Sequence, residues 1–191
     1  FYGDGFIAVE SFKAVLDAHE TGETTLGVIP IDDPSRLAAV ELDGDYVIRL
    51  LEKPQQGETT SKLANTGIYL FNSEIFDHIR DTGISSRGEY EVTDSIGLLI
   101  ESGANVKAAI LPANGWMDVG HPWDLLEANA RALNGLVSSF SGDIEENVSI
   151  YGPVHIGKGT RIRSGTYLEG PIYIGACSDI GPNCYIRPYT S

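Results

Sequence analysis

Polar residues stand at three places where the pattern predicts that a strand ends, and together they could do chemistry. Asp4 lies between two glycines after an aromatic pair, Glu52-Lys53 closes an aliphatic run before a proline, and Asp118 stands among apolar residues in GWMDVGHPWDLL. Taken singly, they are explained as a turn former, a solvated strand end and a residue that bonds amides near a helix start. Ligands of open α/β sheets bind beyond the carboxyl ends of strands, so the three together favour a ligand site.

Helix and strand signals alternate from residue 1 to about 134, and these elements must position the polar stretches. β-branched and aliphatic runs predict strands at 24–29, 37–42, 46–51, 66–71, 106–111 and 116–119. An Asp-Gly turn between the second and third of these predicts a hairpin. Amphipathic spacing predicts helices at 11–19, with Ser11 as N-cap, at 73–80, at 93–101, and at 122–133, with Pro122 in the first turn. Such alternation predicts an α/β domain with a mixed sheet.

A period of six residues takes over after a Gly/Ser-rich stretch, NGLVSSFSGD, which we interpret as the domain boundary. Large aliphatic residues recur at every sixth position: Ile144, Ile150, Ile156, Ile162, Leu168, Ile174, Ile180 and Ile186. This period is typical of the hexapeptide repeat of parallel β-helices, in which aliphatic residues of successive coils stack; a run of hairpins with coincidental isoleucines is the alternative. The sequence therefore predicts domains at 1–134 and 144–191, joined by a linker at 135–143.

The charge balance, 27 acidic against 13 basic residues for a net charge of −14, argues against nucleic acid as a partner. Such surfaces also occur in proteins that work at high salt; a melting temperature that does not rise in molar salt would contradict that hypothesis. No apolar run reaches the roughly 18 residues of a membrane span, so no membrane partner is expected. Cys177 and Cys184 are expected to be small buried residues in a reducing compartment, which favours a cytoplasmic protein.

Six motifs of this chain resemble those of the sugar-1-phosphate nucleotidyltransferases, in particular an archaeal two-domain type that is also an amino-sugar acetyltransferase. The motifs cover essentially the whole chain: YGDGF, DDPSRLAAVELDGDYVIRLLEKP, NTGIYLFNSEIF, SSRGEYEVTD, GWMDVGHPWDLLEAN and GTYLEGPIYIGACSDIGPNCYIRPYT. The resemblance implies an incomplete Rossmann-like nucleotidyltransferase domain followed by a left-handed parallel β-helix, a fold that commonly assembles as a homotrimer. The implied reaction joins a nucleoside triphosphate, UTP or dTTP, to a sugar 1-phosphate and releases pyrophosphate.

Metal and phosphate ligands follow from the resemblance, motif by motif. Asp4 and Asp118 would hold Mg²⁺, an ion that prefers oxygen ligands and keeps several waters. Lys53 would meet the sugar phosphate as a point charge. Arg87, in the SRGEYEVTD segment, is a weaker candidate for phosphate contact, because that segment could simply order the start of the helix expected at 93–101.

The sugar contacts follow in the same way. Glu52 would accept hydrogen bonds from sugar hydroxyls, Asn65 would offer its side-chain amide, and Gly67 would let the strand backbone approach the ligand closely. Ala38 departs from the family pattern, because relatives carry a glycine near this position that contacts the nucleotide sugar. The sugar preference is therefore left open.

The Gly-rich loop that wraps the triphosphate in the family has no counterpart in this chain, and we expect it upstream of Phe1. The repeat is likewise expected to continue beyond Ser191, where relatives have their acetyl-CoA site. The chain by itself is therefore expected to be inactive. Two alternatives stay open: a monofunctional thymidylyl- or guanylyltransferase whose β-helix serves only assembly, and a non-catalytic subunit that binds sugar nucleotides to regulate a partner.

Overall fold

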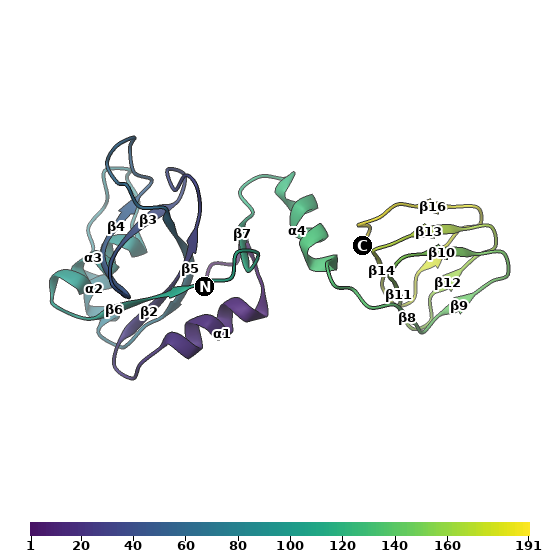
Figure 1. Cartoon of the computed structure of the whole chain (residues 1–191), viewed down its shortest axis with the longest axis horizontal. Coiled ribbons are helices and arrows are strands. Elements are labelled where there is room, and N and C mark those ends of the chain that lie inside the picture. The colour runs from purple at the N-terminus through teal and green to yellow at the C-terminus, as the bar shows by residue number, and fades with distance from the viewer. The chain divides into compact units, whose positions relative to one another are not determined.

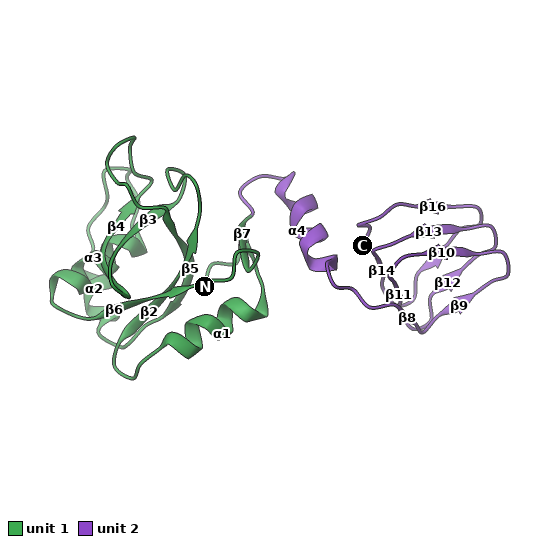
Figure 2. Ribbon diagram, viewed as in Figure 1, with its two compact units in different colours: residues 1–118 green, residues 119–191 purple.

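The computed structural model describes residues 1–191, and the chain divides into two compact units, Phe1–Asp118 and Val119–Ser191 (Figures 1 and 2). The first unit contains β1 (Gly5–Ile7), α1 (Val9–Ala18), β2 (Thr24–Pro30), β3 (Ala38–Asp43), β4 (Tyr46–Glu52), β5 (Leu63–Leu70), α2 (Ile75–Asp81), α3 (Val92–Glu101), β6 (Val106–Ile110) and β7 (Trp116–Asp118). The second unit contains α4 (Asp124–Leu133), β8 (Ser139–Phe140), β9 (Asp143–Ile144), β10 (Ser149–Tyr151), β11 (Val154–Ile156), β12 (Arg161–Ile162), β13 (Tyr167–Glu169), β14 (Ile172–Ile174), β15 (Asp179–Ile180) and β16 (Tyr185–Ile186). None of the helices has the length and apolarity that crossing a bilayer requires.

Five strands of the first unit form a sheet in the order β2-β5-β3-β4-β6, which closes on itself, and β1 pairs with β7 in a separate sheet. β2 pairs parallel with β6 and antiparallel with β5, while β3 and β4 form the predicted hairpin, so the mixed character of the sheet is confirmed. The closure was not predicted. It rests on Tyr46 of β4 pairing with Lys107 of β6, a long-range bridge that leaves no periodic signal in the sequence.

Hydrophobic side chains of this sheet divide between two clusters. Leu26 and Val28 of β2 pack with residues of α2 and α3, including Ile96, in the larger cluster. Val15 of α1 packs in the other cluster, together with Ile68 of β5. Neighbouring residues of β6 contribute to different clusters, as the two-residue period of a strand requires. Helices therefore cover the sheet on both faces, α1 on one and α2 with α3 on the other (Figure 1).

Several predicted boundaries were wrong, and three of them have a clear local reason. Helix α1 begins at Val9, before Ser11, so Ser11 is not the N-cap; its hydroxyl is buried and donates to the carbonyl of Gly115 at 2.8 Å. Strand β5 begins at Leu63, before the expected start at 66, because it continues its pairing with β2. Helix α4 begins at Asp124, since Pro122 lies in the turn before the helix.

Short parallel strands of the second unit stack as the coils of a β-helix, and the six-residue period explains their register. Ile150 pairs with Leu168 and Leu168 with Ile186, each three hexapeptides apart, and Ile162 pairs with both Ile144 and Ile180. The three sheets, in the orders β10-β13-β16, β14-β11-β8 and β15-β12-β9, enclose a core of aliphatic side chains. β8, which lies within the stretch 135–143, pairs parallel with β11.

Neither cysteine is buried, which corrects the expectation from sequence. Cys177 is exposed and Cys184 is partly exposed. Cys177 lies at a turn between β14 and β15 and has a φ of 59°. Its exposed side chain lies outside the coil interior, where isoleucine and threonine side chains are packed. The coil therefore excludes the position from its core.

Candidate active site

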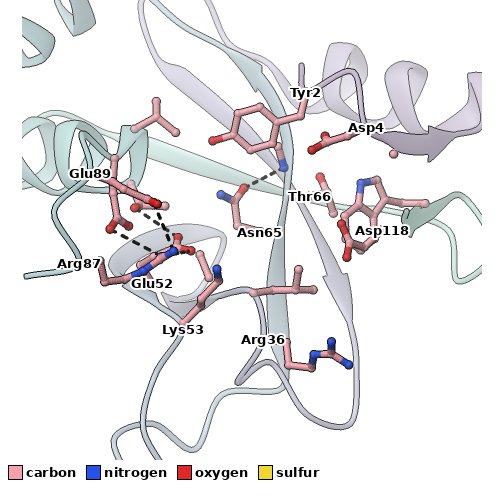
Figure 3. A pocket seen from close by; sticks show the side chains of 18 of the residues that line it. Tyr2, Asp4, Arg36, Glu52, Lys53, Asn65, Thr66, Arg87, Glu89 and Asp118 are labelled. Atoms are coloured by element: carbon pink, nitrogen blue, oxygen red, sulfur yellow. Dashed lines mark hydrogen bonds and ion pairs between the residues drawn. The ribbon is translucent and has the colours of Figure 1, made fainter. Parts of the chain in front are cut away.

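Asp4 and Asp118 come together through the pairing of two short strands. β1 and β7 pair antiparallel, with Gly5 opposite Asp118, so Asp4 directly precedes the partner of Asp118. Both aspartates are exposed and line a cavity of about 470 Å³ that Glu52, Lys53 and Asn65 also line. Figure 3 shows Asp4 and Asp118 on one side of this cavity, Glu52 and Lys53 on the other, and Asn65 between them. Residues from four separate stretches of sequence thus meet in one place.

The strand that carries Asp118 is anchored to helix α1 through Gly115. The carbonyl of Gly115 accepts hydrogen bonds from the backbone N–H of Ala8 and from the Ser11 hydroxyl, each at 2.8 Å. A Cβ at Gly115 would lie 2.3 Å from the Ser11 oxygen, so only glycine permits this approach. Ser11, expected to cap a helix, instead fixes the loop that leads to a proposed metal ligand.

Glu52 and Lys53 end β4 in a backbone conformation that is unusual for their types. Glu52 pairs with Ala38 of β3, and the N–H of Lys53 donates to the carbonyl of Leu37 at 2.9 Å. Lys53 has a φ of 44°, in the left-handed region that costs a non-glycine residue about 1 kcal/mol. A strained residue of this kind at the wall of a cavity is typical of a functional position.

Arg87 contacts carboxylates on three residues. Its guanidinium lies 3.2 Å from Glu52, 3.3 Å from Glu89 and 3.6 Å from Glu91. The Glu91 carboxylate is almost buried and accepts a hydrogen bond from the hydroxyl of Ser85 at 2.7 Å, so it holds the segment that carries Arg87. Arg87 is therefore placed at the cavity, and in this state its charge is engaged by acids.

The pKa of Glu52 is raised above its ordinary value, first by burial and then by the negative charge of Glu91. Arg87 and Lys53 oppose this rise without cancelling it. Thr93, at the start of α3, donates a hydrogen bond to the second oxygen of Glu52 at 3.5 Å. Glu52 is thus an ionisable group whose charged form gains from a ligand that donates hydrogen bonds to it.

Asn65 is oriented by two hydrogen bonds within β5. Its Nδ2 donates to the hydroxyl of Tyr69 at 2.6 Å, and its Oδ1 accepts from the N–H of Gly67 at 3.2 Å. Gly67 has a φ of 72°, and a Cβ there would lie 2.2 Å from the ring of Tyr2. The group that approaches Gly67 closely in this structure is therefore the Tyr2 ring, and a ligand contact at Gly67 stays a prediction.

Several residues of the cavity region were missed by sequence reasoning, among them Tyr2, Arg36, Tyr69 and Glu91. Tyr69 had a usable signal, because Asn65, Gly67 and Tyr69 alternate along one strand and strand residues two apart share a face. Glu91 had a weaker one, as an acid close to Arg87 in a stretch with other acids. Arg36 stands in a loop, where no periodicity applies.

The donor set fits a magnesium ion that shares its coordination with substrate. No group of three or more His, Cys, Asp or Glu side chains could hold a metal by itself. Mg²⁺ is usually bound by one or two carboxylates together with waters and substrate phosphates, so the pair of Asp4 and Asp118 is sufficient. Acids on the cavity wall also outnumber bases: Asp4, Glu52, Glu89, Glu91 and Asp118 against Arg36, Lys53 and Arg87. An anionic substrate would therefore need a cation beside it.

Comparison with known protein families identifies the family of this chain. A family model described as nucleotidyl transferase matches residues 1–135, and a model described as bacterial transferase hexapeptide (six repeats) matches residues 153–188. The chain belongs to the nucleotidyl transferase family. The resemblance carried by its motifs is thereby confirmed, and the aspartate pair and the cavity lie in its nucleotidyl transferase part.

Relatives of this chain are similar along most of its length. The bifunctional sugar-1-phosphate nucleotidylyltransferase/acetyltransferase of Sulfurisphaera tokodaii is 39% identical over 192 residues, which covers 99% of this chain and 46% of that protein. The bifunctional protein GlmU of Methanocaldococcus jannaschii is 42% identical over 195 residues, covering 100% and 47%. The glucose-1-phosphate thymidylyltransferase of Streptomyces antibioticus is 36% identical over 162 residues, covering 84% and 44%. The chain thus spans about half the length of the curated relatives it matches.

Solved structures are similar as well, and one of them illustrates the likeness. It is a candidate glucose-1-phosphate thymidylyltransferase from Bacillus anthracis, in complex with a sucrose, at a TM-score of 0.54 and 29% identity. The similarity covers 68% of this chain and 52% of that chain. It supports the fold of the nucleotidyl transferase.

Proposed function

We propose that the protein transfers a nucleotidyl group from a nucleoside triphosphate, UTP or dTTP, to a sugar 1-phosphate and releases pyrophosphate. The observation that carries this proposal is the pairing of Gly5 with Asp118, which sets two carboxylates on a cavity also lined by Glu52, Lys53 and Asn65. A relative named as a bifunctional sugar-1-phosphate nucleotidylyltransferase/acetyltransferase and one named as a glucose-1-phosphate thymidylyltransferase support the same reaction.

The reaction requires positioning and charge neutralisation, and no protein nucleophile. A phosphate oxygen of the sugar 1-phosphate forms a bond to the α-phosphorus of the triphosphate, and the bond from that phosphorus to the pyrophosphate oxygen breaks. Asp4 and Asp118 would hold Mg²⁺, which when bound supplies positive charge to the phosphate oxygens. Lys53 would hold the phosphate of the sugar 1-phosphate as a point charge.

Sugar recognition is proposed for the residues that face the cavity from the strand ends. Glu52 accepts hydrogen bonds from sugar hydroxyls, Asn65 donates its remaining amide hydrogen, and Gly67 keeps the β5 backbone free of a side chain next to them. Arg87 contacts the phosphate after it leaves the carboxylates of Glu89 and Glu91. The ionised form of Glu52, disfavoured by burial, is the form that these sugar hydroxyls stabilise.

Finer features of the fold and assembly belong to the same proposal. We expect a Rossmann-like nucleotidyltransferase domain at 1–134, a linker at 135–143 and a left-handed β-helix from 144 onward. The hexapeptide match supports assembly through the coils, for which a homotrimer is the expected form. Light scattering that gives a monomer would contradict the assembly.

The experiment that tests the reaction measures pyrophosphate release by the product of the intact gene. UTP or dTTP is supplied with Mg²⁺ and, in turn, glucose 1-phosphate, N-acetylglucosamine 1-phosphate and glucosamine 1-phosphate. We expect release that depends on both substrates and on Mg²⁺. No release with any of these sugar phosphates would overturn the proposal and favour a sugar-nucleotide-binding subunit.

A second proposed activity is acetyl transfer to an amino-sugar 1-phosphate. It is supported by the hexapeptide match and by the similar protein from Sulfurisphaera tokodaii, which is named as a nucleotidylyltransferase/acetyltransferase. Thiol release from acetyl-CoA with glucosamine 1-phosphate as acceptor is the measurement. Its absence in an intact gene product that does release pyrophosphate would assign the coils to assembly alone.

A further inference from the structure

A hydrogen bond within β5 fixes the side chain of a proposed sugar contact. Asn65 Nδ2 donates to the hydroxyl of Tyr69 at 2.6 Å. The ring of Tyr69 in turn meets the ring of Tyr2 edge-on, with centroids 6.0 Å apart. Tyr2 is two residues before Asp4. Tyr69 itself is absent from the cavity wall, so it contacts two wall residues from behind.

Tyr2 is held against β5 by its backbone and by its ring. Its backbone N–H donates to the carbonyl of Gly67 at 3.2 Å. Its ring fills the space that a side chain at residue 67 would need, since a Cβ there would lie 2.2 Å from the ring. Backbone and ring therefore dock the residues before Asp4 on β5 at Gly67, two residues after Asn65.

The direction of these hydrogen bonds decides how the Asn65 amide points. The N–H of Gly67 can only donate, so it selects the amide oxygen, and the Tyr69 hydroxyl then receives the amide nitrogen. The amide is left with one N–H for a sugar hydroxyl.

We propose that Tyr69 is a positioning residue that sets the Asn65 amide for the sugar. The proposal rests on the function proposed above. A tyrosine kept only for packing would have no reason to bond a side chain of the cavity wall through its hydroxyl.

The Tyr69→Phe variant isolates the hydroxyl, because the ring that stacks on Phe71 at 4.9 Å is retained. Tyr46→Phe is the matched control: it removes a hydroxyl from the same sheet at the bridge between β4 and β6, outside the cavity. Thermal melts of both variants check that the fold persists. We expect Tyr46→Phe to bind its ligands with wild-type affinity.

The first measurement is the side-chain amide signal of Asn65 in ¹⁵N NMR spectra, assigned by its loss in Asn65→Asp. We expect a shift of this signal in Tyr69→Phe and none in Tyr46→Phe. An unchanged signal in Tyr69→Phe would overturn the proposal, whatever the ligand affinities are. This readout needs no substrate, so it tests the orientation of the amide even if the proposed reaction is wrong.

The second measurement compares the affinity for glucose 1-phosphate with that for inorganic phosphate, by calorimetry in the presence of Mg²⁺. Losing one neutral hydrogen bond is expected to weaken sugar 1-phosphate binding in Tyr69→Phe by roughly threefold to tenfold, with inorganic phosphate affected less than about twofold. Equal losses for both ligands would point to general loosening and overturn the proposal. A wild-type protein that binds no sugar 1-phosphate would overturn the proposed function.

The third measurement follows Mn²⁺ binding by its electron paramagnetic resonance signal, with Mn²⁺ in place of Mg²⁺. We expect Tyr69→Phe and Tyr46→Phe to bind Mn²⁺ as the wild type does, because the Tyr69 hydroxyl bonds Asn65 and the proposed metal ligands are Asp4 and Asp118. Weakened Mn²⁺ binding in Tyr69→Phe would overturn a role of the hydroxyl that is confined to Asn65.

Discussion

Arginine–carboxylate pairs occur in both compact units, yet the carboxylates respond in opposite directions. On the coil, the hydrogen bonds from Arg163 hold the pKa of Asp179 below its ordinary value. In the cavity, burial and the charge of Glu91 raise the pKa of Glu52, although Arg87 lies 3.2 Å away. The coil pairs lie on an exposed face, where water already solvates both charges. The cavity pair is partly desolvated, so its carboxylate has more to gain from a new partner, as a binding site requires.

The largest effect on turnover is expected from a substitution at a proposed metal ligand. Asp118→Asn keeps the size of the side chain and removes the charge, so turnover in the product of the intact gene should fall on the order of 10³-fold. Asp143→Asn, at an exposed aspartate that begins β9 on the coil, is the control and should keep full turnover. Steady-state pyrophosphate release measures both. Retained turnover in Asp118→Asn would remove this residue from the metal site.

The next largest effect is expected from a substitution that destabilises the coil and does not touch the cavity. Ile162 is fully buried between Ile144 and Ile180, so Ile162→Ala should lower the free energy of unfolding of the second unit by about 3 kcal/mol. Its exposed neighbour in β12, Arg161, is the control, and Arg161→Ala should leave the unfolding midpoint unchanged. Urea unfolding followed by circular dichroism is the measurement. All residues that line the cavity lie in the first unit, so glucose 1-phosphate binding by the folded Ile162→Ala protein should stay unchanged, and weakened binding would contradict this expectation.

This contrast explains which parts of the structure could be predicted from sequence. In the coil, Ile150 and Leu168 are partners because they are separated by three equal repeats, so one period fixes every contact. In the cavity, Asp4 meets Asp118 only through the pairing of β1 with β7, and no local pattern encodes that register. Asp4 and Asp118 were predicted to share a metal site only because their motifs resemble those of the family. The motifs gave no indication of Tyr2 behind Gly67 and only a weak one of Glu91 beside Arg87, because both contacts depend on how the chain packs.

A smaller effect is expected at Gly67, where strain and close contact can be separated. Gly67→Ala places a Cβ on a backbone with φ of 72°, and this Cβ would lie 2.2 Å from the Tyr2 ring. Gly44→Ala places a Cβ on a backbone with φ of 58°, where no atom lies within 4 Å of it. Gly44→Ala should cost about 1–2 kcal/mol in unfolding free energy, from backbone strain alone. Gly67→Ala should cost more and should also weaken Mn²⁺ binding, because Tyr2 must move. Equal stability losses with intact Mn²⁺ binding would show that the Tyr2 contact does not matter.

The smallest effect concerns pH and tests the comparison of the two carboxylates directly. Folding raises the pKa of Glu52 above 4.5, so its stabilising contribution is complete below that pH and is lost as the pH rises through the raised value. Folding lowers the pKa of Asp179 below 3.8, so its contribution is present above that pH and is lost as the pH falls through the lowered value.

Replacing each carboxylate by its amide should therefore change stability in opposite directions at pH 7. Glu52→Gln should raise the melting temperature slightly, because the variant no longer carries a partly desolvated charge, and this gain should disappear near pH 4. Asp179→Asn should lower the melting temperature slightly at pH 7 or leave it unchanged. Calorimetric melts between pH 4 and 7 measure both, and a Glu52→Gln protein less stable than wild type at pH 7 would contradict the assigned direction. A gain in stability together with loss of sugar 1-phosphate binding would mean that Glu52 is kept ionised for its ligand at a cost to the fold.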